Sequence, residues 1–298
     1  MNFVLSLTSE QVLFFLDYYK NEAEPSDNTH IKRVITDNEL TITVYHTNKV
    51  VFQGKTAAKH ALFWQEKFGL EDFKQPIKVE MHSDYYLPSI GSDESGVGDY
   101  FGPLTVCAAY VGEEHISWLK TLKIKDSKLI KDVEIKKIAV QLIEKIPYSL
   151  LILDNEKYNQ MIEKGYNAHK LKAHLHAQCH KHLTKKIGLK VPIIVDQFCT
   201  EAQYKNYTKD FKGLIMPTHF QTKAESYYLS VAVASIIARY SFITKLDQLS
   251  EKIGVPLLKG ASGKVDELAK FILDTKGEKT LRKIAKVHFK TTQKATQL

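Results

Sequence analysis

Hydrophobic residues in the first part of the chain follow two different periods, one typical of strands and one typical of helices. The short apolar runs are residues 2–7, 31–36, 40–45 and 50–53, and the helical patterns are residues 12–19 and 57–68. Thr8 precedes the first helical pattern as a candidate N-cap, and Glu10 gives that helix an acidic first turn. We interpret the polar segment 22–28, which contains Pro25, as a loop. The pattern therefore predicts a small unit with the order β-α-β-β-β-α that ends near residue 70.

The larger remaining part of the chain alternates apolar runs with helical patterns. It follows residues 71–89, whose two prolines and mixed charges are typical of a linker. The expected buried strands are 104–111, 149–153 and 191–195, and the expected helices are 134–146, 168–187, about 225–245 and about 264–273. Strands that alternate with helices predict an α/β domain with a mixed sheet and flanking helices.

The chain of 298 residues carries a formal net charge of +8, but this charge is distributed unevenly. Residues 1–80 hold 9 basic and 11 acidic side chains, net −2, so the remainder of the chain is net +10. A polyanion such as nucleic acid would be attracted mainly by that remainder.

Three widely spaced cysteines without a CxxC pair suggest neither disulfides nor a zinc ribbon. Because we find no membrane-spanning apolar run and no signal-peptide pattern, we expect a cytoplasmic protein.

Acidic residues recur at the ends of the predicted strands, where they can meet in space. Asp93 and Glu94 follow a short strand-like segment, Asp196 follows the last strand, and Glu225 begins a predicted helix. Neighbouring residues of a strand point to opposite faces, so the first pair depends on the strand end to reach one site. Carboxylates placed together repel one another unless a cation compensates, and oxygen ligands suit Mg²⁺ or Mn²⁺. Each residue alone is more typical of a turn or cap, whereas the four together predict a site for two metal ions.

Five histidines crowd one predicted helix: His169, His174, His176, His180 and His182. His176 and His180 stand four residues apart, as zinc ligands on a helix do, but no glutamate completes the metalloprotease pattern. We therefore favour a polar helix face directed toward nucleic acid or solvent over a metal site. The C-terminal lysines are expected to be solvated and within reach of phosphates: Lys283, Lys286, Lys290 and Lys294.

The glycine-rich segment after the carboxylate pair belongs to a longer motif. Residues 91–103, Gly-Ser-Asp-Glu-Ser-Gly-Val-Gly-Asp-Tyr-Phe-Gly-Pro, closely resemble the signature of bacterial ribonuclease HIII, a branch of the type 2 ribonuclease H family. Further matches follow in the same order at residues 126–128, 166–168, 195–198, 223–225, 235–239 and 286–290. The resemblance therefore covers nearly the whole chain, and its first motif is long enough to be specific.

The resemblance implies a fold, a reaction and a cofactor. The fold is a ribonuclease H-like α/β domain over residues 90–298, preceded by the linker 71–89 and by a small TATA-binding-protein-like domain, residues 1–70, that helps to hold the substrate. The reaction is hydrolysis of the RNA strand of RNA–DNA hybrids, which leaves 5′-phosphate and 3′-hydroxyl ends. The residues implied as catalytic and as ligands of Mg²⁺ or Mn²⁺ are Asp93, Glu94, Asp196 and Glu225.

Substrate contacts are implied for a further group of residues: Ser95, Gly96, Val97, Gly98, Lys128, Asn167, Lys49 and Lys55. The glycines would let backbone amides approach the sugar–phosphate backbone and detect the 2′-hydroxyl that distinguishes RNA from DNA. Ribonuclease HII has Gly-Arg-Gly at this point, and its arginine helps to recognise a ribonucleotide–DNA junction. Val97 stands in that position here, which favours cutting within longer RNA stretches over excision of single ribonucleotides.

The N-terminal part has a net charge of −2, which fits poorly with holding a polyanion. Lys49, Lys55 and Lys59 could still gather on one face, with Tyr45 and Phe52 as flat contacts for the substrate. Aromatic residues of a sheet are more often core residues, so this role depends mainly on the resemblance.

Two functions from other classes are weighed against a ribonuclease. A nucleic-acid-binding protein of the same fold without catalysis is disfavoured, because four carboxylates facing a polyanion would oppose binding. A metal-dependent nuclease or phosphatase with another substrate would be separated by comparing RNA–DNA, RNA–RNA and DNA–DNA duplexes. We expect a monomer, because one active site is complete within one chain.

Overall fold

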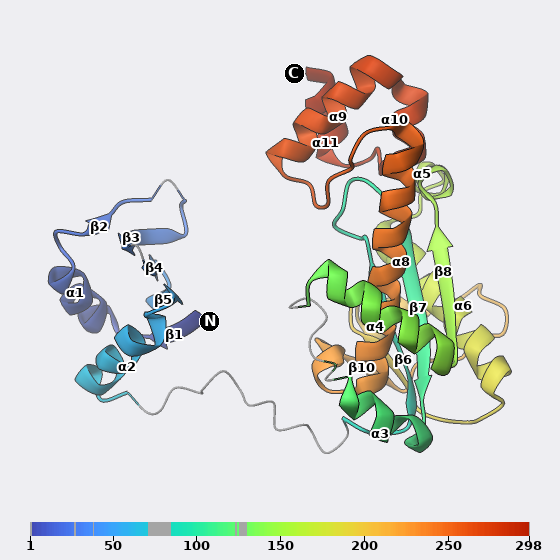
Figure 1. Cartoon of the computed structure of the whole chain (residues 1–298), viewed down its shortest axis with the longest axis horizontal. Helices are drawn as coiled ribbons and strands as arrows, with labels where there is room; N and C mark the ends of the chain where they lie inside the picture. The colour runs from blue at the N-terminus through green and yellow to red at the C-terminus, as the bar shows by residue number, and fades with distance from the viewer. Residues whose placement is uncertain are drawn as a thin grey trace. The chain divides into compact units, whose positions relative to one another are not determined.

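The computed structural model describes residues 2–26, 28–37, 39–70, 85–122, 124 and 130–297. Two units that pack separately make up the chain, Met1–Glu80 and Met81–Leu298. Figure 1 colours the first unit blue and the second unit green to red. Most of the predicted linker, residues 71–84, lies outside the described residues, and so does Lys128.

The N-terminal unit is an antiparallel sheet with two helices. Its elements are β1 (Asn2–Ser6), α1 (Ser9–Tyr18), β2 (Ala23–Glu24), β3 (Ile31–Asp37), β4 (Leu40–Tyr45), β5 (Lys49–Gly54) and α2 (Ala57–Phe68). The strand order is β1-β5-β4-β3-β2, and every neighbouring pair is antiparallel. The small TATA-binding-protein-like fold is thus confirmed. The segment 22–28, predicted to be a loop, differs because it contributes the two-residue strand β2, which pairs with β3.

Local sequence explains the start of α1 and the core beneath it. Thr8 and Gln11 exchange hydrogen bonds between side chain and backbone, so a capping box begins the helix. Phe15 from α1, Phe52 from β5 and Trp64 from α2 are fully buried in one cluster. Burial of a large apolar side chain contributes roughly 1.5–3 kcal/mol, so these three residues bind the sheet to both helices.

The larger unit is built around a five-stranded mixed sheet. Its strands are β6 (Ser89–Ser95), β7 (Leu104–Val111), β8 (Tyr148–Leu153), β9 (Ile193–Asp196) and β10 (His219–Gln221). Its helices are α3 (Glu113–Thr121), α4 (Asp132–Lys145), α5 (Asn155–Glu163), α6 (Ala168–Ile187), α7 (Glu201–Tyr207), the 3-10 helix η2 (Ala224–Ser226), α8 (Leu229–Ile253), α9 (Gly263–Lys276), α10 (Glu278–Ile284) and α11 (Lys290–Gln297). In the order β10-β9-β6-β7-β8, the first three strands are parallel and β7 is antiparallel to both neighbours. The predicted α/β domain with a mixed sheet is confirmed.

Helices α8 and α6 pack on opposite faces of this sheet (Figure 1). A Cβ atom at Gly91 of β6 would lie 2.2 Å from the backbone nitrogen of Val231, so only glycine lets α8 approach so closely. The next residue, Ser92, points the other way and contacts His176 and His180 of α6. Successive residues of β6 therefore face different helices, so its two carboxylates, Asp93 and Glu94, have different neighbours.

Helix α8 is the central helix of the core. By length and composition alone it could cross a membrane, but 78% of its apolar segment is buried inside the unit. Its alanines at 232, 234 and 238 are fully buried, and they allow close packing against β6 and β7. The apolar character of α8 is that of a core helix.

Several boundaries differ from the predictions. Strand β6 continues to Ser95, so Asp93 and Glu94 lie within the strand rather than after it. Glu225 lies in η2, and α8 begins only at Leu229, because the backbone is extended at residue 228 between the two helices. The sequence did not predict α3, α5, α7, α10 and α11, since helices of about two turns are too short to show a clear period.

Candidate active site

Strand register brings the predicted carboxylates together at one end of the sheet. Strands β6 and β9 are parallel and pair as far as Ser92 and Val195, so the next residues, Asp93 and Asp196, lie side by side where the pairing stops. The amide of Ala224 donates a 2.9 Å hydrogen bond to Asp196 Oδ1. This bond fixes η2 at the same end of the sheet, and Glu225 follows Ala224 in that helix.

Asp93 lies among like charges in a buried setting. The residue is only 7% exposed, and Glu225 is 3% exposed. Burial raises the pKa of Asp93 well above its ordinary value, and the charges of Glu94, Asp196 and Glu225 raise it further. A 2.7 Å hydrogen bond from the Glu94 amide to Asp93 Oδ1 opposes the shift without cancelling it. A carboxylate that resists ionisation in this way favours the binding of a cation.

Glu94 points to the opposite face of β6, where it meets two side chains of α6. Lys172 Nζ donates to Glu94 Oε1 at 2.7 Å, and His176 Nε2 lies 2.9 Å from Glu94 Oε2. Burial raises the pKa of Glu94, but the hydrogen bonds and charges of His176 and Lys172 together outweigh it, so the pKa lies below its ordinary value. Both oxygens of this carboxylate therefore have partners within the protein.

A chain of hydrogen bonds continues from His176 into the core. Ser92 Oγ lies 2.9 Å from His176 Nδ1 and 2.8 Å from His180 Nε2. Every contact is satisfied when His180 donates to Ser92, Ser92 to His176, and His176 to Glu94. Burial, with a smaller effect of His176, lowers the pKa of His180 well below its ordinary value, in agreement with a neutral ring. The prediction that these histidines lie on a polar face toward nucleic acid or solvent is wrong, because both are fully buried.

The four carboxylates are of the right chemical type to bind a divalent metal ion, but the structure does not arrange them as a metal site. Among the residues that the structure describes, no group of three or more His, Cys, Asp and Glu side chains is placed to hold a metal ion. Asp93 lies within electrostatic range of Glu94, Asp196 and Glu225, and both oxygens of Glu94 are already engaged by Lys172 and His176. Carboxylate oxygens are nevertheless the ligands that Mg²⁺ and Mn²⁺ prefer, and the concentrated negative charge around Asp93 fits a cation.

The predicted substrate-binding segment forms a tight connection between β6 and β7. Ser95 ends β6, and Gly96 has a φ of +90° with too little room for a side chain, since a Cβ would lie 2.3 Å from Pro103 O. Val97 packs against a hydrophobic cluster between β7, α5 and α6. Gly98 is the exposed member of the group, and a Cβ there would meet open space.

Two further residues, Asn167 and Lys128, are predicted to contact the substrate. Asn167 is the N-cap of α6, where its Oδ1 accepts the amide of Lys170 at 2.8 Å. This bond gives Asn167 a structural role that any substrate contact would have to share. The role of Lys128, which lies outside the described residues, stays a prediction.

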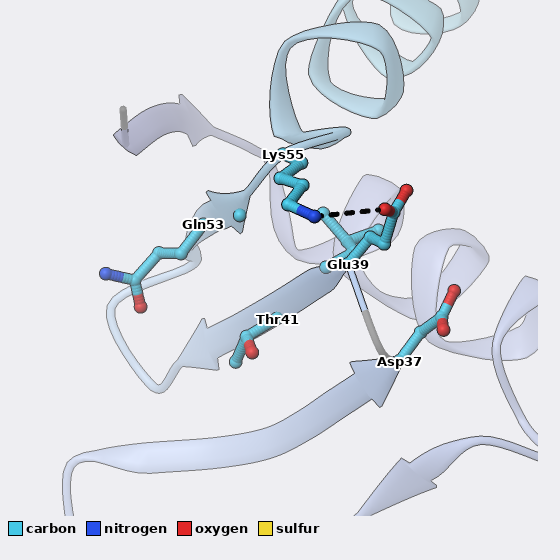
Figure 2. A pocket seen from close by; sticks show the side chains of 7 residues that line it. Asp37, Glu39, Thr41, Gln53 and Lys55 are labelled. Atoms are coloured by element: carbon cyan, nitrogen blue, oxygen red, sulfur yellow. Dashed lines mark ion pairs between the residues drawn. The ribbon is translucent and has the colours of Figure 1, made fainter.

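The two predicted lysines of the N-terminal unit lie in β5 and just after it. Lys49 begins β5 and is exposed. Lys55 Nζ pairs with Glu39 Oε1 at 3.5 Å beside a pocket of about 360 Å³ that Asp37 also lines (Figure 2). The surface around Lys55 is therefore mixed in charge. Phe52, expected as a flat contact for the substrate, is fully buried in the core, so that expectation is wrong.

Sequence reasoning misses two buried lysines. Lys172 contacts Glu94, and its only signal in the sequence is a position four residues before His176, on the same face of α6. Lys286, predicted to be solvated, is fully buried and donates to the backbone oxygens of Asp99 at 2.8 Å and Gly102 at 2.6 Å. Burial lowers the pKa of Lys286 to about 7. This lysine ties the C-terminal segment to the β6–β7 connection.

Comparison with known proteins identifies the family. A family model described as "Ribonuclease HII" matches residues 90–292, and one described as "Domain of unknown function (DUF3378)" matches residues 2–76. Ribonuclease HIII of Bacillus subtilis is 46% identical over 272 residues, which cover 87% of this chain and 85% of that protein. The chain belongs to the ribonuclease HIII family. Ribonuclease HIII of Oceanobacillus iheyensis is 41% identical over 99% of this chain and 98% of that protein.

Solved structures of ribonuclease HIII agree with this assignment. A crystal structure described as Bst-RNase HIII in complex with Mn²⁺ has a TM-score of 0.70 and 36% identity, and covers 100% of this chain and 98% of that chain. The structure of Aquifex aeolicus RNase H3, 23% identical with a TM-score of 0.56, shows the same fold. The predicted family and fold class are confirmed. Ribonucleases of this family cleave the RNA of RNA–DNA hybrids in a metal-dependent reaction, and this chain is a ribonuclease H.

Proposed function

We propose that the catalytic site of this ribonuclease HIII, which would hold two Mg²⁺ or Mn²⁺ ions, consists of four carboxylates: Asp93, Glu94, Asp196 and Glu225. The observation that carries the proposal is the position of Asp93, which is buried beside Asp196 where the pairing of β6 with β9 stops, with a raised pKa. Repulsion of this kind destabilises a fold unless a cation offsets it. In a family that hydrolyses phosphodiesters, metal ions are the cations expected at such a site.

The chemistry divides between the metal ions and the chain. When bound, the ions supply an activated water and stabilise the charge on the leaving oxygen. Asp93 and Glu225, which are themselves almost closed to solvent, would supply ligand oxygens in surroundings where electrostatic interactions are stronger than in water. Hydrolysis would leave a 5′-phosphate and a 3′-hydroxyl on the RNA, as the resemblance implies.

The connection between β6 and β7 is proposed to select RNA. The backbone at Gly98 is exposed and open to a sugar 2′-hydroxyl. Val97 occupies the position of the ribonuclease HII arginine, and its side chain packs into a hydrophobic cluster. It therefore offers no polar contact to a ribonucleotide–DNA junction, which supports cutting within longer RNA stretches.

The remaining parts of the chain support the same reaction. Residues 1–70 are proposed to contact the substrate through Lys49 and Lys55, and residues 71–89 to join them to the catalytic domain, residues 90–298. A complete carboxylate set within one chain supports a monomer. Its three cysteines are all free, which supports a cytoplasmic location.

The test is a cleavage assay with a short labelled RNA–DNA hybrid and matching RNA–RNA and DNA–DNA duplexes, each with Mg²⁺, Mn²⁺ or a chelator. We expect metal-dependent cutting of the hybrid alone. Asp93→Asn should lower the rate by about a thousandfold or more, because the amide removes a charge at the reacting centre. Asp17→Asn removes a carboxylate that is 78% exposed and serves as the matched control.

Three results would count against parts of the proposal. An active Asp93→Asn variant would place the site elsewhere in the chain. Binding of the hybrid without cutting, under every metal, would return the function to a nucleic-acid-binding protein. A duplex with one embedded ribonucleotide that is cut as fast as the long hybrid would refute the proposed substrate preference.

A further inference from the structure

The ammonium group of Lys172 forms an ion pair with Glu94, one of the proposed metal ligands. Its Nζ is 2.7 Å from Glu94 Oε1, and the side chains of Lys172 and Glu94 are 7% and 14% exposed. Salt and solvent screen a pair this buried only weakly. A divalent ion on the same oxygen would stand within a few ångströms of the ammonium, and two cations so close in a poorly solvated site repel each other strongly.

Packing around Lys172 keeps its ammonium group in this position. Lys172 Nζ lies 4.2 Å from the centroid of the Phe198 ring, and the ring of His176 stacks on Phe198 with centroids 5.2 Å apart. Phe198 follows Asp196 by two residues, so the segment that ends β9 provides both a proposed ligand and the platform under Lys172. Lys172, His176 and His180 are spaced four residues apart and form one row along α6.

The two oxygens of Glu94 are held by different partners. His176 holds Oε2 at the end of the hydrogen-bond chain through Ser92 and His180, and this bond fixes the direction of the carboxylate whether or not the ring is charged. Lys172 holds Oε1 by charge as well as by a hydrogen bond. Without Lys172, the carboxylate would keep its orientation through His176 while Oε1 became available.

We propose that Lys172 is a built-in counter-ion of Glu94 that competes with a divalent metal ion for Oε1, while His176 is the positioning residue that keeps this carboxylate in place. The inference rests on the proposed function, because it takes Glu94 as a metal ligand. Lys172 stabilises the carboxylate site in the absence of metal and raises the metal concentration needed to fill it. To bind a metal ion through Oε1, Glu94 must therefore exchange a cation of the protein for the metal ion.

The experiment measures Mn²⁺ binding to the full chain by titration calorimetry without nucleic acid. Lys172→Met keeps the length of the side chain and removes its charge, and we expect Mn²⁺ to bind about tenfold more tightly than to the wild type. Lys172→Arg, which keeps the charge, should bind like the wild type. Lys185→Met removes the same charge from an exposed position of α6 and should change the affinity by less than about twofold.

Unchanged or weaker Mn²⁺ binding by folded Lys172→Met would overturn the proposal. Circular dichroism and urea unfolding of the metal-free variants establish folding, and Lys172→Gln, which removes the charge but still offers a hydrogen-bond donor, makes the same prediction if Lys172→Met does not fold. Asp93→Asn separates the two proposals. If the wild type binds no Mn²⁺, or Asp93→Asn binds it equally well, the proposed metal site fails. If only the Lys172→Met effect is missing, competition by Lys172 fails alone.

Discussion

Asp93 and Glu94 are neighbours in β6, yet their pKa values are shifted in opposite directions on the two faces of the sheet. On the α8 face, Asp93 is buried among other carboxylates, and its pKa is raised. On the α6 face, Glu94 is almost equally buried beside Lys172 and His176, and its pKa is lowered. Burial alone would raise both pKa values, so the hydrogen bonds and charges of His176 and Lys172 decide the direction at Glu94.

The comparison shows that one short strand can prepare two ligands for a cation in different ways. Asp93 is repelled by the carboxylates around it, and a bound cation would relieve this repulsion. Glu94 is instead paired with a cation of the protein, the Lys172 ammonium. A buried ion pair is favourable as a pair and costly when one member is lost. In the metal-free protein, the negative charge at Asp93 is therefore destabilising, whereas the charge of Glu94 is neutralised by Lys172. Removal of the charge at Asp93 and at Glu94 is predicted to have opposite effects on stability.

The largest effect is expected from Glu94→Gln. This substitution removes the counter-ion of Lys172, whose side chain is 93% buried, and should lower the free energy of unfolding by about 3–5 kcal/mol. Urea unfolding in the presence of a chelator measures the change. The double variant Glu94→Gln/Lys172→Met removes both charges and should recover most of the lost stability. A stable Glu94→Gln protein would mean that Lys172 reaches solvent, and the contrast between the two faces would lose its basis.

The next effect concerns Lys286, a buried lysine whose partners are backbone oxygens rather than a carboxylate. Burial lowers its pKa from 10.5 to about 7. Between these values the unfolded chain binds more protons than the folded chain, so stability should rise with pH from about 7 toward 10.5. Relative to Lys286→Met, the gain across this window should be a few kcal/mol, on the order expected for a shift of several pKa units.

Urea unfolding at a series of pH values checks this, and Lys286→Met is the reference because the exposed lysines titrate in both proteins. In the variant, the side-chain amide of Asn155 still donates to Gly102 O at 2.9 Å, so that backbone oxygen keeps a partner. Equal pH dependence in the two proteins would show that Lys286 keeps its proton in the folded state. A buried lysine would then need no carboxylate, and the role given to Glu94 beside Lys172 would be weakened.

The sequence predicts the carboxylate end of the sheet better than it predicts the partners around it. Apolar runs locate β7, β8 and β9, and the acidic motifs beside them place Asp93 and Asp196 at one end of the sheet. The alternation of a strand even implies that Asp93 and Glu94 face different ways. Lys172, His176 and Lys286 are polar residues of ordinary spacing, and lysines are almost never fully buried unless paired. Their burial depends on contacts distant in sequence, such as the packing of α6 on β6, which no local pattern contains.

The smallest and most discriminating effect is expected from Asp93→Asn in the metal-free protein. The pKa of Asp93 is raised in the folded state, so the wild type loses stability as pH rises from the ordinary aspartate value through the folded value. Asparagine does not titrate, and its oxygen can still accept the Glu94 amide that donates to Asp93 Oδ1 at 2.7 Å. The variant should therefore be more stable than the wild type by about 1 kcal/mol near pH 9 and by less near pH 5.

Urea unfolding with a chelator at the two pH values measures the Asp93→Asn effect. Added Mn²⁺ should reverse the order of stability, since the wild type alone keeps the full carboxylate set for the metal. Glu94→Gln and Asp93→Asn each remove one negative charge from adjacent residues, so a general effect of charge would shift both variants in the same direction. Destabilisation of both would refute the contrast, because it would mean that Asp93, like Glu94, is stabilised by a positive partner within the protein.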